Sequence, residues 1–181
     1  MAAAQDDADR RRRFEELVGE TYEPVQRYLR RRTDPATADD VLGDVLLVLW
    51  RRLDDVPPSA PLPWAYGVAR GCLANNRRSA ARQERVALRL AHTHRPSEPA
   101  DDDVLTECLD ALPDADRELL RLWAWEQLTP AGLAQVLGIT ANAASIRLHR
   151  AKGKLKKLLL ARKDGGAAGH PGVREEGGAG L

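Results

Sequence analysis

One stretch constrains the fold of this chain more than any other: residues 128–159, LTPAGLAQVLGITANAASIRLHRAKGKLKKLL. Thr129 followed by Pro130 predicts the start of a helix, because a hydroxyl caps free backbone N–H groups and proline suits the first helical position. Gly138 then predicts a turn with positive φ, and Thr140 is placed to cap a second helix. Two helices joined this tightly indicate a helix-turn-helix.

The second of these helices separates a buried seam from a polar face. At about 100° per residue, four apolar side chains fall on one side: Ala144, Leu148, Ala151 and Leu155. Between Ser145 and Lys163 the chain has eight Lys or Arg and no acid. Groups that reach base edges, followed by cations that reach phosphates, are typical of a recognition helix. The alternative is a solvated basic face on an ordinary helix.

We therefore expect this helix to contact duplex DNA with two kinds of side chain. Those expected to set sequence preference are Asn142, Ser145, Ile146 and His149. Those expected to contact phosphates are Arg147, Arg150, Lys152 and Lys154. The Ile146 side chain can either touch a thymine methyl group or simply pack within its own domain.

Length and charge bound the remaining possibilities. The chain has 181 residues, which allows one ordinary domain or two small ones, and its formal net charge is +1. That balance hides a segregation, because the segment from Glu98 to Glu118 holds nine acids and the single base Arg117. A basic surface for nucleic acid can therefore coexist with a nearly neutral chain.

Several classes of function are not expected. No stretch approaches 18 uncharged apolar residues and the N-terminus lacks an apolar core, so we expect neither membrane insertion nor a signal peptide. Cys72 and Cys108 indicate a reduced, cytoplasmic chain. His92 and His94 lack the spacing of metal ligands, so no metal or cofactor is expected. The absence of an acid pair, a nucleophile–base arrangement or a phosphate loop argues against an enzyme.

The N-terminal half also has helical periodicity. Residues 1–9 are expected to be disordered, and the candidate core positions that follow are Phe14, Leu17, Val18, Val25 and Leu29. Pro24 is expected to end or kink the first helix, since proline removes a backbone donor. The Asp34-Pro35 pair predicts a turn, and the next helix is expected to be capped by Thr37 or Asp39.

Residues 40–53, DVLGDVLLVLWRRL, form a helix that is apolar nearly all round. Such a helix is buried by its own domain on one face and by something else on another. In so small a domain, complete internal burial is hard to arrange. A partner-binding surface and a simple central core helix are therefore both open.

Residues 64–85, WAYGVARGCLANNRRSAARQER, combine an apolar stripe with many arginines. Aromatic rings can stack on unpaired bases while guanidinium groups meet phosphates, so this segment suits single-stranded nucleic acid. The candidate contact residues are Trp64, Arg70, Asn75, Arg77, Arg78 and Arg82. The alternative is that Trp64 belongs to the core and the arginines are merely solvated.

The sequence thus predicts an all-α protein of two small helical domains, residues 10–85 and 104–163, of which the second ends in the helix-turn-helix. The linker between them, residues 86–103, has little apolar content and is expected to be flexible. In the second domain, Pro113 should stop one helix and Asp114 should cap the next. The Gly-rich residues 164–181 are expected to be disordered.

Five segments in order resemble the extracytoplasmic-function (ECF) sigma factors, the two-domain class of bacterial RNA polymerase sigma subunit. They are YEPVQRYLRRR, ADDVLGDVLLVLWRRL, WAYGVARGCLANNRRSAAR, ALPDADRELLRLWAWEQLT and LAQVLGITANAASIRLHRAKGKL. The gap between the two halves leaves no room for the middle domain of housekeeping sigma factors.

The resemblance implies a non-enzymatic subunit that directs promoter-specific transcription initiation. Residues 10–85 would be a region 2-like domain that binds core RNA polymerase, with Asp40, Asp44 and Leu47 as the contact, and that reads the minus-ten element with the Trp64–Arg82 segment. Residues 104–163 would be a region 4-like domain that reads the minus-thirty-five element. An anti-sigma protein is also implied as a partner. A stand-alone helix-turn-helix regulator is the alternative.

The sequence also departs from the family pattern. Gly43 stands where a polar side chain is usual, and Gly71 and Asn75 stand where Asn and Asp are common. Gly132 occupies the usual acidic position, and Thr129 therefore lacks its capping-box partner. The promoter sequence that the chain reads does not follow from the resemblance.

Overall fold

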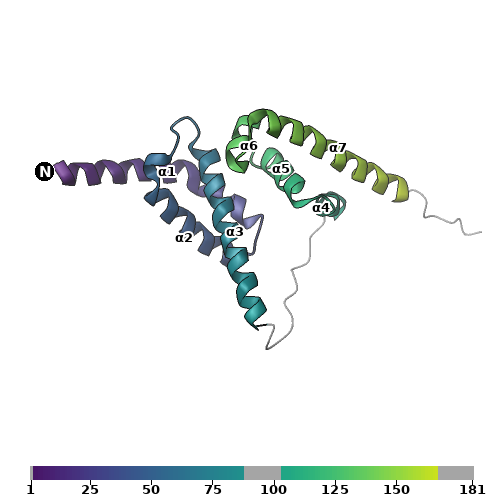
Figure 1. Cartoon of the computed structure of the whole chain (residues 1–181), viewed down its shortest axis with the longest axis horizontal. Helices are drawn as coiled ribbons and strands as arrows, with labels where there is room; N and C mark the ends of the chain where they lie inside the picture. The colour runs from purple at the N-terminus through teal and green to yellow at the C-terminus, as the bar shows by residue number, and fades with distance from the viewer. Residues whose placement is uncertain (1, 88–102, 167–181) are drawn as a thin grey trace, which may run out of the picture.

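Seven α-helices and one short 3-10 helix account for the regular structure of the residues described by the computed structural model, 2–87 and 103–166 (Figure 1). Their bounds are α1 Ala2–Arg30, α2 Pro35–Arg51, η1 Leu53–Asp55, α3 Pro61–Ala87, α4 Asp103–Asp110, α5 Asp114–Ala124, α6 Pro130–Leu137 and α7 Ala141–Gly166. The expected all-α fold is confirmed. Within the described ranges, no helix combines the length and apolarity needed to cross a membrane.

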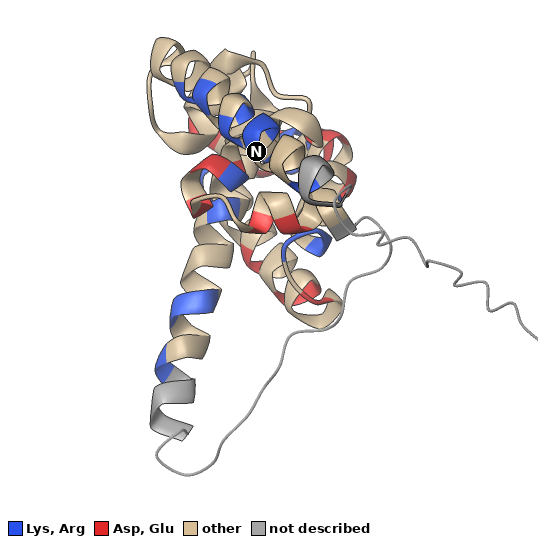
Figure 2. Ribbon diagram, turned by 90° about the vertical axis from the view of Figure 1, so that its right-hand side faces the viewer, with Lys and Arg blue, Asp and Glu red and all other residues tan. Residues whose placement is uncertain are grey.

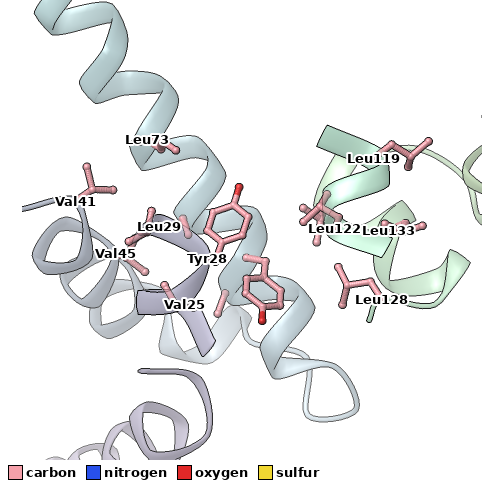
Figure 3. Packing of buried hydrophobic residues seen from close by; sticks show 14 of the residues in the cluster. Val25, Tyr28, Leu29, Val41, Val45, Leu73, Leu119, Leu122, Leu128 and Leu133 are labelled. Carbon is pink, nitrogen blue, oxygen red and sulfur yellow. The ribbon is translucent and has the colours of Figure 1, made fainter. Parts of the chain in front are cut away.

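The first domain consists of α1, α2 and α3, which pack against one another. Its core is formed by apolar side chains at helical spacing, among them Val25, Leu29, Val41, Val45 and Leu73 (Figure 3). The apolar helix α2 supplies much of this core, because Val41, Leu42, Val45 and Leu49 are all buried. Of the two alternatives left open by the sequence, α2 is therefore mainly a core helix, and one of its faces stays exposed.

Helix α1 differs from the sequence prediction in where it starts and in how it passes Pro24. It begins at Ala2, whereas residues 1–9 were expected to be disordered, and ion pairs from Arg11 to Asp7 and Arg12 to Asp9 support the added turns. It also continues through Pro24. Proline leaves the carbonyl of Glu20 without its usual donor, but Glu20 is exposed, so water can satisfy that group.

Helix α2 begins earlier than expected because Asp34, rather than Thr37 or Asp39, is its N-cap. The Asp34 carboxylate accepts a hydrogen bond from the backbone N–H of Thr37 at 3.0 Å, and Pro35 takes the first helical position. That hydrogen bond lowers the pKa of Asp34. The carboxylate that the sequence reading assigned to a turn is thus the helix start itself.

The second domain consists of α4 to α7 and contains the predicted helix-turn-helix. Thr129 caps α6, accepting a hydrogen bond from the N–H of Gly132, and Thr140 caps α7 through the N–H of Ala143 at 3.1 Å. In the seam of α7, Ala144, Leu148 and Ala151 are buried and Leu155 is half-buried, as expected. One detail differs: α5 starts at Asp114, with Pro113 as an N-cap that gives no side-chain hydrogen bond.

Gly138 ends α6 with φ of 66°, as the sequence predicted. A side chain is strained in this left-handed region, so Gly138→Ala should lower the free energy of unfolding by about 1 kcal/mol. Gly153 is the matched control, because it lies inside α7 with open space at its Cβ position. Gly153→Ala should instead stabilise the protein by up to about 1 kcal/mol. Chemical denaturation measures both, and equal signs would contradict the argument.

The two domains pack directly on each other. Helix α6 lies against α3, where a Cβ at Gly67 would be 3.8 Å from the Cα of Val136. Leu122 and Leu128 of the second domain lie across from Tyr28 of the first, and all three belong to one buried cluster (Figure 3). The expected linker falls largely on residues 88–102, which lie outside the described residues, as does the tail from residue 167.

Candidate nucleic-acid interface

The residues expected to read base edges are exposed on α7. Asn142, Ser145, Ile146 and His149 all reach the surface, and Ile146 keeps 44% of its area accessible. The Ser145 hydroxyl donates to the carbonyl of Ala141 at 3.0 Å. Because Ala144, Leu148 and Ala151 of the seam are buried, these side chains project from a helix whose rotation is fixed by packing.

Lys and Arg residues follow α7 along its length (Figure 2). The four cations of this helix that are expected to contact phosphates fall into two groups. Arg147 and Arg150 are exposed. Lys152 lies over the ring of Trp123 at 3.4 Å, and Lys154 pairs with Asp116 at 2.6 Å. The first two side chains are therefore better placed to meet phosphates than the lysines, which are already held by their own domain.

The six residues expected to bind a single strand come from α3. Arg70, Asn75, Arg77, Arg78 and Arg82 are exposed, whereas Trp64 is half-buried with the guanidinium of Arg52 at 5.4 Å from its ring centre. Asn75 accepts a hydrogen bond from Arg78. Arg77 donates to the backbone carbonyl of Arg32 at 2.7 Å, so it also joins α3 to the end of α1.

A single cleft of about 1180 Å³ brings the two predicted DNA surfaces together. Helix α3 contributes Arg70, Asn75, Arg77 and Arg78, and helix α7 contributes Arg147, Arg150 and Lys154. The remaining predicted contacts of α7 do not line it. Sequence reasoning placed these two sets on separate domains and did not predict that they face a common space.

The expected polymerase contact lies on the outward face of α2. Asp40, Asp44 and Leu47 are all exposed, and Leu47 keeps 53% of its area accessible on a helix whose other face is buried. Their spacing of four and three residues puts them on one side of the helix. Gly43 lies on the same exposed side, with open space at its Cβ position.

Sequence reasoning missed a cluster of ionic side chains between the domains, which we call the latch: Arg31, Arg32, Glu118 and Glu126. Arg32 pairs with Glu118 and with Glu126, both at 3.1 Å, and Arg31 pairs with Glu126 at 2.6 Å. The arginines directly follow α1, and the glutamates lie in α5 and just after it. These partners are 86 to 95 residues apart, so no local sequence signal identifies them.

Two tyrosines adjoin the latch. The hydroxyl of Tyr28 donates to Glu118 at 3.1 Å, and the guanidinium of Arg32 lies 3.7 Å from the centre of its ring. Burial, followed by the charge of Glu118, raises the pKa of Tyr28 well above its usual value. Burial and the charge of Glu126 likewise raise the pKa of Tyr66 to about 12. Both hydroxyls therefore keep their protons at neutral pH and act as donors.

The described residues contain no group of three or more His, Cys, Asp or Glu side chains placed to hold a metal ion. His92 and His94 lie outside the described residues, and Cys108 is buried in the second domain. The cleft shared by α3 and α7 is lined by arginines and Lys154 together with three acids, Asp114, Asp116 and Glu118, and the cations are the groups that can meet phosphates.

Comparison with known proteins gives matches to both domains. Sigma-70 region 2 matches residues 17–83, and Sigma-70, region 4 matches residues 102–155. The chain is 30% identical over 160 residues to the ECF RNA polymerase sigma factor SigK of Mycolicibacterium vanbaalenii, covering 81% of this chain and 79% of that protein.

Two further proteins are similar over most of this chain. The probable RNA polymerase sigma factor RfaY of Xanthomonas campestris is 30% identical over 154 residues, which cover 77% of this chain but only 38% of that protein. The solved structure of CnrH in complex with the cytosolic domain of CnrY has a TM-score of 0.59 and 26% identity, covering 88% of this chain and 95% of that chain.

Proposed function

Because this chain belongs to the ECF RNA polymerase sigma factors, we propose that it holds core polymerase with its first domain and reads promoter DNA with both domains. Sigma factors are not enzymes; they bind RNA polymerase and promoter DNA and direct promoter recognition. The observation that carries the proposal is the exposed basic and polar face of α7. This helix belongs to a helix-turn-helix whose caps and buried seam are those predicted from the sequence.

The second domain reads the minus-thirty-five element as a duplex. Helix α7 enters the major groove, where Asn142, Ser145, Ile146 and His149 set sequence preference. Arg147 and Arg150 contact phosphates and give an affinity that falls with salt. Lys152 and Lys154 reach phosphates after releasing Trp123 and Asp116, so their contribution is smaller.

The first domain reads the minus-ten element as a single strand. Helix α3 presents Arg70, Arg77, Arg78 and Arg82 to the phosphates, with Asn75 able to hydrogen-bond a base. Trp64 is half-buried and braced by Arg52, which supports a stacking surface at the edge of the domain. In the same domain, the exposed face of α2 with Asp40, Asp44 and Leu47 binds polymerase.

Arg150→Ala is expected to weaken promoter binding by the polymerase-bound chain about tenfold, because one charge-assisted phosphate contact is lost. The slope of log affinity against log salt concentration should fall by about one. Lys156→Ala is the matched control: Lys156 is exposed on α7 but lies about 240° around the helix from Arg150. Filter binding over a salt series measures both, and an unchanged Arg150→Ala complex would refute the assignment.

We further propose that the chain acts in the cytoplasm and is restrained by a protein of the anti-sigma type. The similar protein CnrH forms a complex with the cytosolic domain of CnrY, which supports a protein partner for this chain as well. Co-purification of the tagged chain from its own cells, with and without core polymerase, tests this partner.

Run-off transcription with purified core polymerase over a promoter library tests the function itself. The proposal requires that the chain bind core polymerase and that transcripts start from a defined subset of promoters. Binding of a specific duplex by the free chain, without association with core polymerase, would instead favour a stand-alone helix-turn-helix regulator.

A further inference from the structure

We propose that Ile146 is a specificity-determining residue that reads the C5-methyl group of a thymine in the major groove. The inference rests on the proposed function, which lays α7 in that groove, and it names the chemical group that one exposed side chain of the helix recognises. A corollary concerns DNA methylation. Because 5-methylcytosine presents a methyl group at the same place as thymine, methylation of a cytosine at this position should create the same contact.

Ile146 points away from the core of its own domain. At about 100° per residue, its side chain lies about 160° around the helix from those of Ala144 and Leu148. Those two residues are buried, whereas Ile146 is 44% exposed, and among the described residues it is not one of the hydrophobic side chains that pack against the buried cluster. Of the two alternatives that the sequence left open, packing within the domain is therefore excluded.

The groups around Ile146 are those of a face that can read base pairs. Asn142 and Arg150 lie about one turn before and after it, each about 40° away around the helix, and His149 lies about 60° away. Gly153 continues nearly the same line about two turns further on, with open space at its Cβ position. No side chain at that position holds the helix away from the DNA.

Within residues 141–154, Ile146 is the one exposed side chain that is both large and apolar. It can neither donate nor accept a hydrogen bond, so it cannot recognise the donors and acceptors on base edges. The apolar group that the major groove offers is the methyl group of thymine. Any other base edge in that place would lose water from its polar atoms without gaining a partner. Both effects favour thymine.

The side chain is also presented in a fixed direction. A β-branched residue in a helix occupies nearly a single χ1 rotamer, and the buried Ala144, Leu148 and Ala151 fix the rotation of α7. A contact made by Ile146 therefore costs little conformational entropy. Helix stability does not account for an isoleucine at this exposed position, because its helix propensity is lower than that of alanine.

The contact has an expected place in the promoter element. Ile146 lies four residues beyond Asn142, which is about 6 Å along the helix axis and less than two base pairs at about 3.4 Å each. The Asn142 side chain is of the type that bonds both N6 and N7 of an adenine. We therefore expect the thymine within about two base pairs of the base that Asn142 reads.

The test removes the methyl group and keeps the base pair. Duplexes are selected by the full-length chain, with and without core polymerase, and each thymine of the selected minus-thirty-five element is replaced singly by uracil. One replacement should weaken binding about fourfold, the effect expected for one buried methyl group. In Ile146→Ala the same replacement should have no effect, because the shorter side chain no longer reaches the methyl group. Fluorescence anisotropy of the labelled duplex measures the affinities.

Two further variants serve as controls. Ile146→Val keeps the β-branch and should keep most of the loss caused by uracil. Leu160→Ala removes a side chain that is 49% exposed and lies about 21 Å further along α7, so the fourfold loss should be unchanged. Alanine is favoured at an exposed helical position, so Ile146→Ala should fold, and circular dichroism verifies this.

Cytosine methylation supplies the opposite change. A cytosine opposite guanine is placed at the identified position, with and without a methyl group at C5. The methylated duplex should bind the wild-type chain about fourfold more tightly than the unmethylated duplex. Ile146→Ala should bind the two duplexes equally.

Three results would overturn the proposal: no loss of affinity at any thymine, a loss that is equal in the wild type and Ile146→Ala, or a selected element without thymine. Run-off transcription from the selected promoters reports the proposed function separately. Methyl-dependent binding through Ile146 without transcription would refute the function and keep this assignment, whereas transcription without methyl dependence would do the reverse. Failure to select any duplex would overturn both.

Discussion

Leu49→Ala is expected to lower the free energy of unfolding by about 2–5 kcal/mol, the range measured for deleting a large buried aliphatic side chain. Leu49 is 1% exposed on α2, in the core shared with α1 and α3. Its removal leaves a cavity that three packed helices cannot close without strain. Chemical denaturation followed by circular dichroism measures the change.

Leu47→Ala is the control for that experiment, since Leu47 lies two residues away on the same helix but is 53% exposed. Its free energy of unfolding should change by less than about 0.5 kcal/mol. If the two variants were destabilised equally, the assignment of inner and outer faces to α2 would be wrong.

Leu47→Asp is expected to weaken binding of the chain to core polymerase by at least about 30-fold, equivalent to the 2 kcal/mol of an interface hot spot. The exposed leucine lies about one turn beyond Asp44 on the face that also carries Asp40, and it is the large apolar side chain of that set. Burying a new carboxylate against the polymerase would leave it without a partner. Fluorescence anisotropy of the labelled chain, titrated with core polymerase, gives the affinity.

Leu160→Asp serves as the comparison, because Leu160 is 49% exposed on α7 and lies outside the proposed polymerase contact. Its polymerase affinity should equal that of the wild type. Wild-type affinity for Leu47→Asp, or an equal loss in both variants, would show that the outward face of α2 is not the docking surface.

Much of the second domain could be predicted because its determinants are local. Thr129, Gly138 and Thr140 each act through hydrogen bonds or dihedral angles within a few residues, so the sequence alone identifies the turn. The buried seam of α7 follows from helical period in the same way. The exposed face of the recognition helix is then the remainder of its surface.

The N-terminal differences arise where local rules compete with tertiary packing. An internal proline such as Pro24 ends or kinks most helices. Here Val25 is buried in the core and the lost hydrogen bond falls on the solvent side, so packing holds the helix together. The Asp34-Pro35 pair is a turn signal, yet the same pair is also a strong helix start. Where a residue pattern is compatible with two local structures, tertiary contacts determine which of them forms.

The contact between the domains could not be predicted for a different reason. The latch partners are far apart in the sequence, and a charged side chain in a helical pattern is ordinarily read as solvated. Glu126 is instead 9% exposed overall, with its carboxylate enclosed by groups from the other domain. Only the three-dimensional arrangement distinguishes it from the many exposed acids of this chain.

The hydrogen bond from Arg77 to the carbonyl of Arg32 carries a consequence for promoter melting. The same guanidinium that would grip a phosphate of the unpaired strand also steadies the backbone of a latch residue. If Arg77 is the phosphate contact proposed above, a strand that binds it would compete with this hydrogen bond, and by reciprocal linkage the hydrogen bond would oppose binding of the strand. Binding of the unpaired strand would thus release the backbone of Arg32 from α3.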